Sequence, residues 1–203
     1  MIFDTVTLFP YGVNCYLIGD AAAGSCAVID PGADPDKVLE LIRKSGLRLE
    51  KIFLTHGHYD HVGAAAAVAQ AFPGTEVLLH PADAREKADA RLFPPLAQAS
   101  APLSEGQTLA VGGVAVQVLH TPGHSAGSVT LLAEDMMLCG DTLFAGSCGR
   151  FDFADGSQEA LLASLARLGR LERDYKVCPG HGPLSTLEAE RRTNPYLRQA
   201  LAL

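Results

Sequence analysis

The chain has 203 residues, a formal net charge of −7 and 48% apolar residues. This length suits one large domain or two small ones, and the apolar share allows a sizeable core without disulfides. The negative balance argues against general nucleic-acid binding, which needs a basic face. It does not exclude an anionic substrate, because bound metal ions would supply local positive charge.

The N-terminal residues and the cysteines indicate the cellular compartment of the protein. Residues 1–5 show neither the basic segment nor the apolar segment of a secretory signal, and every apolar run is shorter than the about 18 residues of a membrane span. The five cysteines form no CxxC pair, so we expect reduced thiols, a cytoplasmic location and no membrane partner. Cys148 lies in a glycine-rich loop without an adjacent base, so we expect no catalytic role for it.

The first half of the chain alternates predicted strands and helices. Strands are predicted where β-rich runs are bounded by Gly, Pro or Asp, over residues 3–8, 14–18, 26–29, 52–55 and 76–79. Pro35 and an apolar side predict a helix over 35–44. An alanine-rich helix is predicted over 61–72, ended by Pro73-Gly74. A helix start is predicted over 81–90, and the stretch from there to Ser104 is ambiguous.

The second half repeats this style. Predicted strands cover residues 107–111, 114–119, 128–133, 136–139 and 176–178, the first two joined as a hairpin around Gly112-Gly113. Helices are predicted over 157–168 and 187–201, the latter broken at Asn194-Pro195. No linker separates the halves, so we expect one domain over 1–203. Its predicted class is α/β (α+β), a four-layer αββα sandwich of two mixed sheets with helices on the outer faces.

The segment Thr55-His56-Gly57-His58-Tyr59-Asp60-His61 is the most informative part of the sequence, and it follows the largely apolar run 51–54. In an extended segment residues i and i+2 point the same way, so His56 and His58 can face one ion. Asp60 and His61 project from the turn that follows. Imidazole and carboxylate are ligands that Zn²⁺, Fe²⁺ and Mn²⁺ accept, so this segment predicts a metal site.

Three more loops carry a polar residue directly after an apolar run. His124 lies in the Pro-Gly turn 122–123, Asp141 follows the strand predicted over 136–139, and His181 follows Pro179-Gly180. Gly and Pro bend the backbone sharply there, and strand ends hold such loops rigidly. One histidine of this kind would be ordinary, but the three loops together with the histidine-rich segment indicate a shared ligand set.

The candidate ligands suffice for two ions. The nitrogens of His56, His58 and His124 can bind a first metal. One oxygen of Asp60 and the nitrogens of His61 and His181 can bind a second, and Asp141 can bridge the two. A hydroxide between the metals would complete both shells, as in paired-metal hydrolases whose ions lie about 3.5–4 Å apart. Spacing proposes these ligands without proving their pairing.

The remaining polar residues near strand ends are given simpler roles. Asp30 follows a strand and is predicted to accept the free N–H of a ligand histidine, the alternative being a cap or turn residue. His80 and His120 are expected to be structural. Tyr59 is expected to face solvent or to pack, with no role in the site.

The motif order resembles the metallo-β-lactamase fold superfamily. The motifs that carry this resemblance are T-H-G-H-Y-D-H, T-P-G-H-S, G-D-T-L-F and P-G-H-G-P. The resemblance runs from about residue 13 to 197. Within the superfamily the chain is most similar to glyoxalase II, the hydroxyacylglutathione hydrolase group, especially over residues 140–151. The resemblance implies two divalent ions, Zn²⁺ first with Fe or Mn as alternatives, bound by the seven residues proposed above.

The resemblance also implies an activity. It is hydrolysis of a small acyl thioester such as S-D-lactoylglutathione, a step of methylglyoxal detoxification, by attack of a metal-bridging hydroxide. Asp60 would orient the nucleophile while holding its metal, and Arg150 stands where that group has a basic residue contacting glutathione. The expected partner is a small-molecule thioester, with no nucleic acid, and the chain is expected to be a monomer or small homo-oligomer.

Two departures and several rivals stay open. Longer glyoxalase II enzymes carry a helical C-terminal region that grips glutathione, whereas this chain ends at Leu203 like the short stand-alone members, and Asp152 differs from the usual residue. A persulfide dioxygenase of this fold would hold one iron with His56, His124 and Asp141 and shares Gly149-Arg150-x-Asp152. A lactonase, a β-lactamase or a metal-binding redox protein without hydrolysis are further alternatives.

Overall fold

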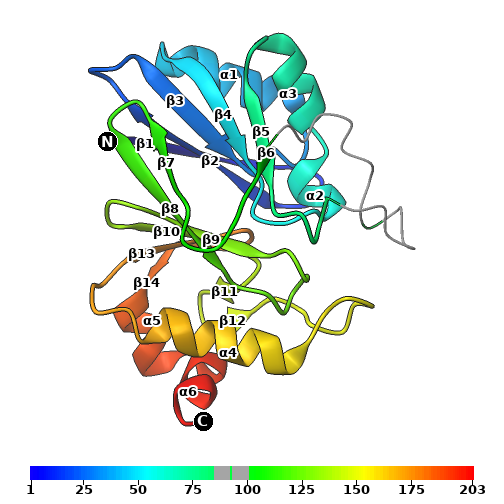
Figure 1. The fold of residues 1–203 in the computed structure, drawn as a ribbon, viewed down its shortest axis with the longest axis vertical. Coiled ribbons are helices and arrows are strands. Elements are labelled where there is room, and N and C mark those ends of the chain that lie inside the picture. Colours follow the sequence, from blue (N-terminus) through cyan, green and yellow to red (C-terminus); the bar gives the residue numbers. More distant parts are fainter. Residues whose placement is uncertain (85–91, 93–100) are drawn as a thin grey trace.

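The computed structural model describes residues 1–84, 92 and 101–203. Two six-stranded sheets pack face to face, and helices cover their outer faces (Figure 1). Both sheets are mixed, so the predicted αββα sandwich is confirmed. Most of the helix start predicted over 81–90 lies outside the described residues, and 81–84 form a turn.

The first sheet has the order β1-β2-β3-β4-β5-β6. Its strands are β1 Ile2–Leu8, β2 Val13–Asp20, β3 Ser25–Ile29, β4 Arg48–Phe53, β5 Glu76–Leu79 and β6 Ala101–Pro102. The first three are antiparallel, and β3 to β6 are parallel. Helices α1 (Pro35–Ser45) and α3 (Ala65–Ala71) pack on this sheet. Asp34 caps α1, and Gly46, with a φ of 69°, ends it in the left-handed region.

The second sheet has the order β14-β13-β10-β9-β8-β7. Its strands are β7 Thr108–Val111, β8 Val114–His120, β9 Val129–Ala133, β10 Met136–Gly140, β13 Lys176–Pro179 and β14 Ser185–Thr186. Only β10 and β13 pair in parallel. The outer helices are α4 Gln158–Gly169, α5 Leu187–Thr193 and α6 Pro195–Leu201. The break predicted at Asn194-Pro195 separates α5 from α6, where Asn194 caps α6.

Three apolar layers hold this arrangement together. The inner layer joins the two sheets through fully buried side chains such as Phe53 and Leu131. One outer layer packs the first sheet against α1 and α3, and the other packs the second sheet against α4 and α6. The central strands are therefore covered on both faces, which explains why β3, β9 and β10 read as continuous apolar runs rather than alternating ones.

The helix predicted over 61–72 is wrong in detail, because the structure has two helices there. Helix α2 (Tyr59–Val62) ends at Gly63, and α3 begins at Ala65. A Cβ on Gly63 would lie 2.5 Å from the carbonyl oxygen of Gly32, and the Ala64 N–H donates to Pro31 O at 2.9 Å. This contact with the loop after β3 interrupts the helix, and a local sequence pattern cannot reveal it.

Other differences are smaller. Strand β4 begins at Arg48 and ends at Phe53, earlier than predicted at both ends. The sequence did not reveal β6, β14 or the small hairpin of β11 (Leu143–Phe144) and β12 (Ser147–Cys148), each a strand of two residues. Strands this short depend on their pairing partners and carry no periodic signal. No helix among the described residues is long and apolar enough to cross a membrane.

Candidate metal centre

The loops that follow β4, β8, β10 and β13 meet between the two sheets. They bring together all seven predicted ligands: His56, His58, Asp60, His61, His124, Asp141 and His181. Their possible ligand atoms form three groups, each within 4.8 Å: His56, His58 and His124; His56, His61 and Asp141; and Asp60, His61 and His181. The first and third are the trios predicted from the sequence, and their roles as ligands stay a prediction.

The first trio consists of buried, neutral imidazoles. His58 Nδ1 lies 2.9 Å from His124 Nε2, and the His56 ring centroid is 4.6 Å from that of His58. His124 Nδ1 donates to the carbonyl oxygen of Arg150 at 2.7 Å, which leaves the Nε2 lone pair facing the trio. Burial lowers the pKa of His58 to about 4 and that of His56 well below its ordinary value. These rings are therefore unprotonated at neutral pH, as metal ligands must be.

The second trio is more polar. His181 Nε2 lies 3.2 Å from Asp60 Oδ2 and 3.3 Å from His61 Nε2. His181 Nδ1 faces the carbonyl oxygen of Gly12 at 3.3 Å, so its Nε2 is directed at the cluster. Burial acts to raise the pKa of Asp60, but the hydrogen bond from His181 and the nearby His61 lower it overall. Asp60 is therefore a carboxylate at neutral pH.

Asp30 lies beside His61. Its Oδ2 accepts hydrogen bonds from His61 Nδ1 at 2.9 Å and from the Thr55 hydroxyl at 2.7 Å, and its Oδ1 accepts from the Thr55 backbone N–H at 2.8 Å. Burial alone would lower the pKa of His61, but the carboxylates of Asp141 and Asp30 raise it well above its ordinary value. Asp30 thus fixes the ring of His61 and joins the loops after β3 and β4.

Asp141 lies between the two trios. Its Oδ1 is 3.3 Å from His61 Nε2, and its Oδ2 is 3.5 Å from His124 Nε2 and 3.8 Å from His181 Nε2, so the carboxylate contacts both trios. Burial acts to raise its pKa, but the positive charge of His61 holds the pKa of this carboxyl well below its usual range. Asp141 is therefore ionised, which is the state required of a bridging ligand.

The cluster fits divalent metal ions. Among the described residues, neither His56 Nε2 nor Asp141 Oδ1 has a hydrogen-bond partner, although both are buried. A buried polar atom left without a partner costs about 1–3 kcal/mol, and a coordinated cation would satisfy both. The donor set of imidazole and carboxylate suits zinc, iron and manganese. Gly180 allows close packing here, since a Cβ on it would lie 2.2 Å from Asp141 Oδ1.

An open pocket leads to the cluster from outside. Its volume is about 340 Å³, and besides five of the candidate ligands it is lined by Tyr59, Leu92, Phe144, Cys148, Arg150 and Phe153. Burial raises the pKa of the Cys148 thiol to about 11, so it stays protonated at neutral pH. The sequence analysis gave Leu92, Phe144 and Phe153 no role in the site, because single apolar residues carry no signal of their own.

Arg150 lies at the mouth of this pocket and is held by its own neighbours. Its guanidinium donates two hydrogen bonds of 2.9 Å to the Asp152 carboxylate and lies 4.8 Å from the centre of the Phe153 ring. Phe153 in turn packs edge to face against His58, with centroids 5.0 Å apart. Asp152, the unusual residue noted in the sequence, is therefore the partner of Arg150, and Phe153 links this exposed pair to His58 of the first trio.

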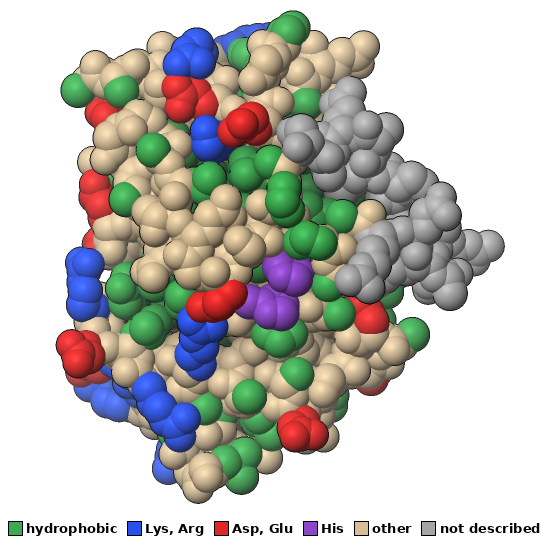
Figure 2. All heavy atoms as spheres, in the orientation of Figure 1, with side chains coloured by type: hydrophobic (Ala, Val, Ile, Leu, Met, Phe, Trp, Pro, Cys, Tyr) green, Lys and Arg blue, Asp and Glu red, His purple; other side chains and the backbone are tan. Residues whose placement is uncertain are grey.

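The other residues discussed from the sequence lie outside the cluster. His80 and His120 stack on each other, with centroids 4.3 Å apart, and His120 Nε2 donates to the carbonyl oxygen of Ala126. Tyr59 is 39% exposed and packs edge to face against Tyr11 at 5.0 Å. Figure 2 shows one face of the molecule, on which histidine reaches the surface only in a small patch beside an acidic and a basic side chain.

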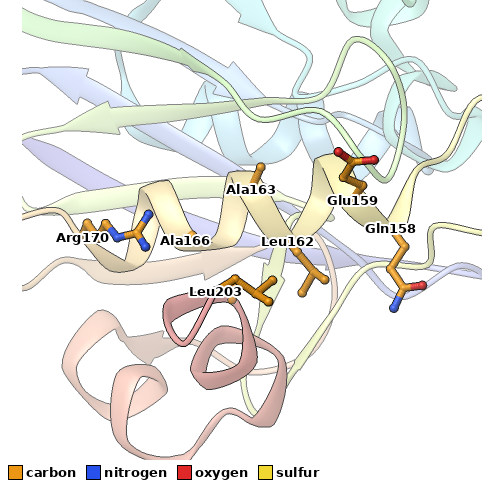
Figure 3. Close-up of a pocket in the computed structure, with 8 residues that line it drawn as sticks. Gln158, Glu159, Leu162, Ala163, Ala166, Arg170 and Leu203 are labelled. Carbon is orange, nitrogen blue, oxygen red and sulfur yellow. The ribbon is translucent and has the colours of Figure 1, made fainter.

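A larger hollow lies elsewhere, on the outer surface of α4. Its volume is about 700 Å³, and it is lined mainly by one side of α4 and by the C-terminal residues Ala200 and Leu203 (Figure 3). None of the seven candidate ligands lines it. The larger hollow is therefore not the candidate metal site, because the candidate ligands line the smaller pocket instead.

Residues 8–181 match the model of the Metallo-beta-lactamase superfamily. The match covers most of the chain and ends at His181, the last of the candidate ligands. Together with the αββα layers and the histidine–aspartate cluster between the sheets, it shows that this chain belongs to the metallo-β-lactamase superfamily.

Similar proteins within the superfamily carry the names of different enzymes. The chain is 33% identical to "Hydroxyacylglutathione hydrolase GloC" of Haemophilus influenzae, over 97% of this chain and 98% of that protein. Among solved structures it is similar to BLEG-1, a B3 metallo-beta-lactamase, with a TM-score of 0.87, 32% identity and coverage of 97% and 99%.

Two other solved structures are also similar to this chain. TTHA1623 in a di-iron-bound form matches with a TM-score of 0.82 and 40% identity, covering 95% of this chain and 99% of that one. ETHE1 from Myxococcus xanthus matches with a TM-score of 0.82 and 30% identity, covering 96% and 84%.

Proposed function

We propose that this chain is a metal-dependent hydrolase of small acyl thioesters of the glyoxalase II type, with S-D-lactoylglutathione as the first candidate substrate. The observation that carries the proposal is the convergence of two donor trios with the Asp141 carboxylate in contact with both, at the base of an open pocket. The likeness to the hydroxyacylglutathione hydrolase GloC supports the substrate class. A cytoplasmic location and a monomer or small homo-oligomer remain part of the proposal.

The proposed roles follow from the geometry. The first ion would be held by His56, His58 and His124 and the second by Asp60, His61 and His181, with Asp141 shared. A bound pair of divalent ions supplies water whose pKa is lowered towards about 7 and polarises a carbonyl oxygen.

The chain's own groups then position the reactants. Asp60, ionised and held by His181, can accept a hydrogen bond from a water molecule and orient it at the pocket base. Phe144 and Phe153 provide apolar walls for the acyl group. A thiolate is a good leaving group, so no strong protein acid is needed.

The first test combines elemental analysis with a hydrolysis assay. We expect the purified chain to carry two divalent ions and to release thiol from S-D-lactoylglutathione, and we expect a chelator to remove both the metal and the activity. Restored turnover on adding back Zn²⁺, Fe²⁺ or Mn²⁺ would identify the competent metals. A protein that keeps its full rate after complete metal removal would contradict the proposal.

A persulfide dioxygenase is the second candidate. The likeness to ETHE1 favours it, and the Arg150–Asp152 ion pair at the pocket mouth lies on the Gly149-Arg150-x-Asp152 segment that the sequence analysis linked with that activity. This alternative predicts one iron held by His56, His124 and Asp141. Oxygen uptake with glutathione persulfide, without thioester hydrolysis, would replace the first proposal with this one.

Arg150 gives a prediction about substrate charge. Its planar guanidinium suits a carboxylate, and a substrate carboxylate would compete with Asp152 for it. We expect Arg150→Gln to raise KM about 3- to 10-fold for an anionic thioester, because an exposed ion pair contributes about 1 kcal/mol. Hydrolysis of an uncharged thioester, measured in parallel, should change little. Equal effects on both substrates would show that Arg150 does not contact the substrate carboxylate.

A further inference from the structure

Asp83 is a buried carboxylate outside the set of candidate ligands. It lies in the turn after β5, where its backbone N–H donates to His80 O at 2.9 Å, and it is 4% exposed. It does not line the pocket, and it belongs to none of the three candidate metal groups. A carboxylate is rarely buried to this degree unless other groups bond to it, so its partners indicate what it does.

The partners of Asp83 lie on both loops that carry the first trio. Its Oδ2 accepts from the Gly57 backbone N–H at 2.9 Å and from the Ser125 hydroxyl at 2.7 Å. Its Oδ1 accepts from the Gly127 backbone N–H at 2.8 Å. Gly57 stands between His56 and His58 in the sequence, and Ser125 directly follows His124. One carboxylate therefore bonds the backbone between His56 and His58 and the side chain of the residue after His124.

These two loops come from different sheets. The loop with His56 and His58 follows β4 of the first sheet, and the loop with His124 follows β8 of the second. Metal ligands must be placed to within a few tenths of an ångström, so the separation of the loops matters for binding. Asp83, which follows β5 of the first sheet, crosses to the second through Ser125 and Gly127. Hydrogen bonds to a carboxylate are short and strong, which suits this task.

The packing around Asp83 leaves it little freedom. A Cβ on Gly127 would lie 2.6 Å from Asp83 Cγ, so the backbone approaches as closely as only glycine allows. The Ser125 hydroxyl is also within 2.7 Å of the Ser128 hydroxyl, which helps to direct it. Among the described residues, three donors thus bond this one carboxylate, and the close packing holds it in place.

We propose that Asp83 is a positioning residue for the first metal position, the one formed by His56, His58 and His124. It holds the two loops at the separation that lets their imidazoles share one ion. At the second position, formed by Asp60, His61 and His181, it is Asp30 that holds His61, so we expect this position to be unaffected by a change at Asp83. This inference rests on the metal pair of the proposed function and not on the thioester chemistry.

The test is a Zn²⁺ titration of the metal-free full-length chain against a competing chelator, comparing wild type with Asp83→Asn. The amide keeps the shape of the side chain but has only one acceptor oxygen, which cannot serve Gly127 on one side and Gly57 with Ser125 on the other. We expect affinity at the first position to fall about 10- to 100-fold, as when groups that orient ligands are changed, with the second position unaltered. Glu172→Gln, an exposed acid-to-amide change in the loop after α4, should leave both affinities at wild-type values.

A second variant keeps the test decisive if Asp83→Asn does not fold, which circular dichroism of the metal-free protein would show. Ser125→Ala removes one of the three donors and should weaken the first position about 10-fold, the lower end of the range. Because both changes remove the same hydrogen bond, the double variant should lose less than the product of the two single losses.

The possible results separate this inference from the proposed function. Equal loss at both positions, or no loss in either variant, would refute the role of Asp83. A wild-type chain that binds no Zn²⁺ would refute both the role and the metal pair. Selective loss at the first position in a chain that hydrolyses no thioester would support the role of Asp83 and refute only the substrate.

Discussion

Asp141→Asn is expected to lower kcat/KM for the thioester by more than about 100-fold, because changes to groups that merely orient metal ligands already cost about 10–100-fold. The carboxylate contacts both trios, at 3.3 Å from His61 Nε2, 3.5 Å from His124 Nε2 and 3.8 Å from His181 Nε2. Asn has the same shape, so Gly180 and the neighbouring loops can stay in place. It offers one oxygen instead of two and no negative charge, so it cannot serve both positions.

The measurement is thiol release together with metal content for the purified variant. We expect Asp141→Asn to hold fewer than two ions while its circular dichroism stays that of the wild type, and His58→Ala to behave in the same way. Asp135→Asn is the matched control, since Asp135 is exposed in the turn between β9 and β10. An Asp141→Asn protein with two bound ions and the wild-type rate would refute a shared role for this carboxylate.

The sequence could predict that the seven candidate ligands lie together, because their positions obey local rules. The spacing of His56 and His58 needs only an extended backbone, and His124, Asp141 and His181 each follow an apolar run that is a strand in the structure. Parallel strands such as β10 and β13 end at the same edge of a sheet, so polar residues that follow them meet. The layered fold follows from the same alternation of strands and helices.

Asp83 shows where local rules stop. In the sequence it lies in the stretch 81–90, where Pro81 favours a helix start, and nothing nearby distinguishes it from a surface acid. Its partners Gly57, Ser125 and Gly127 are far away along the chain. The break between α2 and α3 is of the same kind, because it depends on contact with Gly32. A single sequence contains no signal for contacts of this type.

Gly32→Ala is expected to destabilise the protein by at least about 3 kcal/mol, the upper end of the usual cost of overpacking. A Cβ on Gly32 would lie 1.4 Å from the carbonyl oxygen of Asp60 and 3.0 Å from the Cα of His61. Both atoms belong to the backbone of α2, so no side-chain rotation can relieve the clash. The loop after β3 and helix α2 would have to separate.

That separation would also reach the metal site. Asp30 is on the same loop as Gly32 and bonds His61 at 2.9 Å, so moving the loop away from α2 would stretch this bond and shift the second trio. Urea unfolding of the metal-free protein would measure the loss of stability, and elemental analysis the loss of the second ion. Gly46→Asn is the control. A Cβ added at Gly46 would meet open space, and Asn tolerates the φ of 69° at this position. If Gly32→Ala were as stable as Gly46→Asn and kept both ions, the close packing of the two loops would not be what places His61.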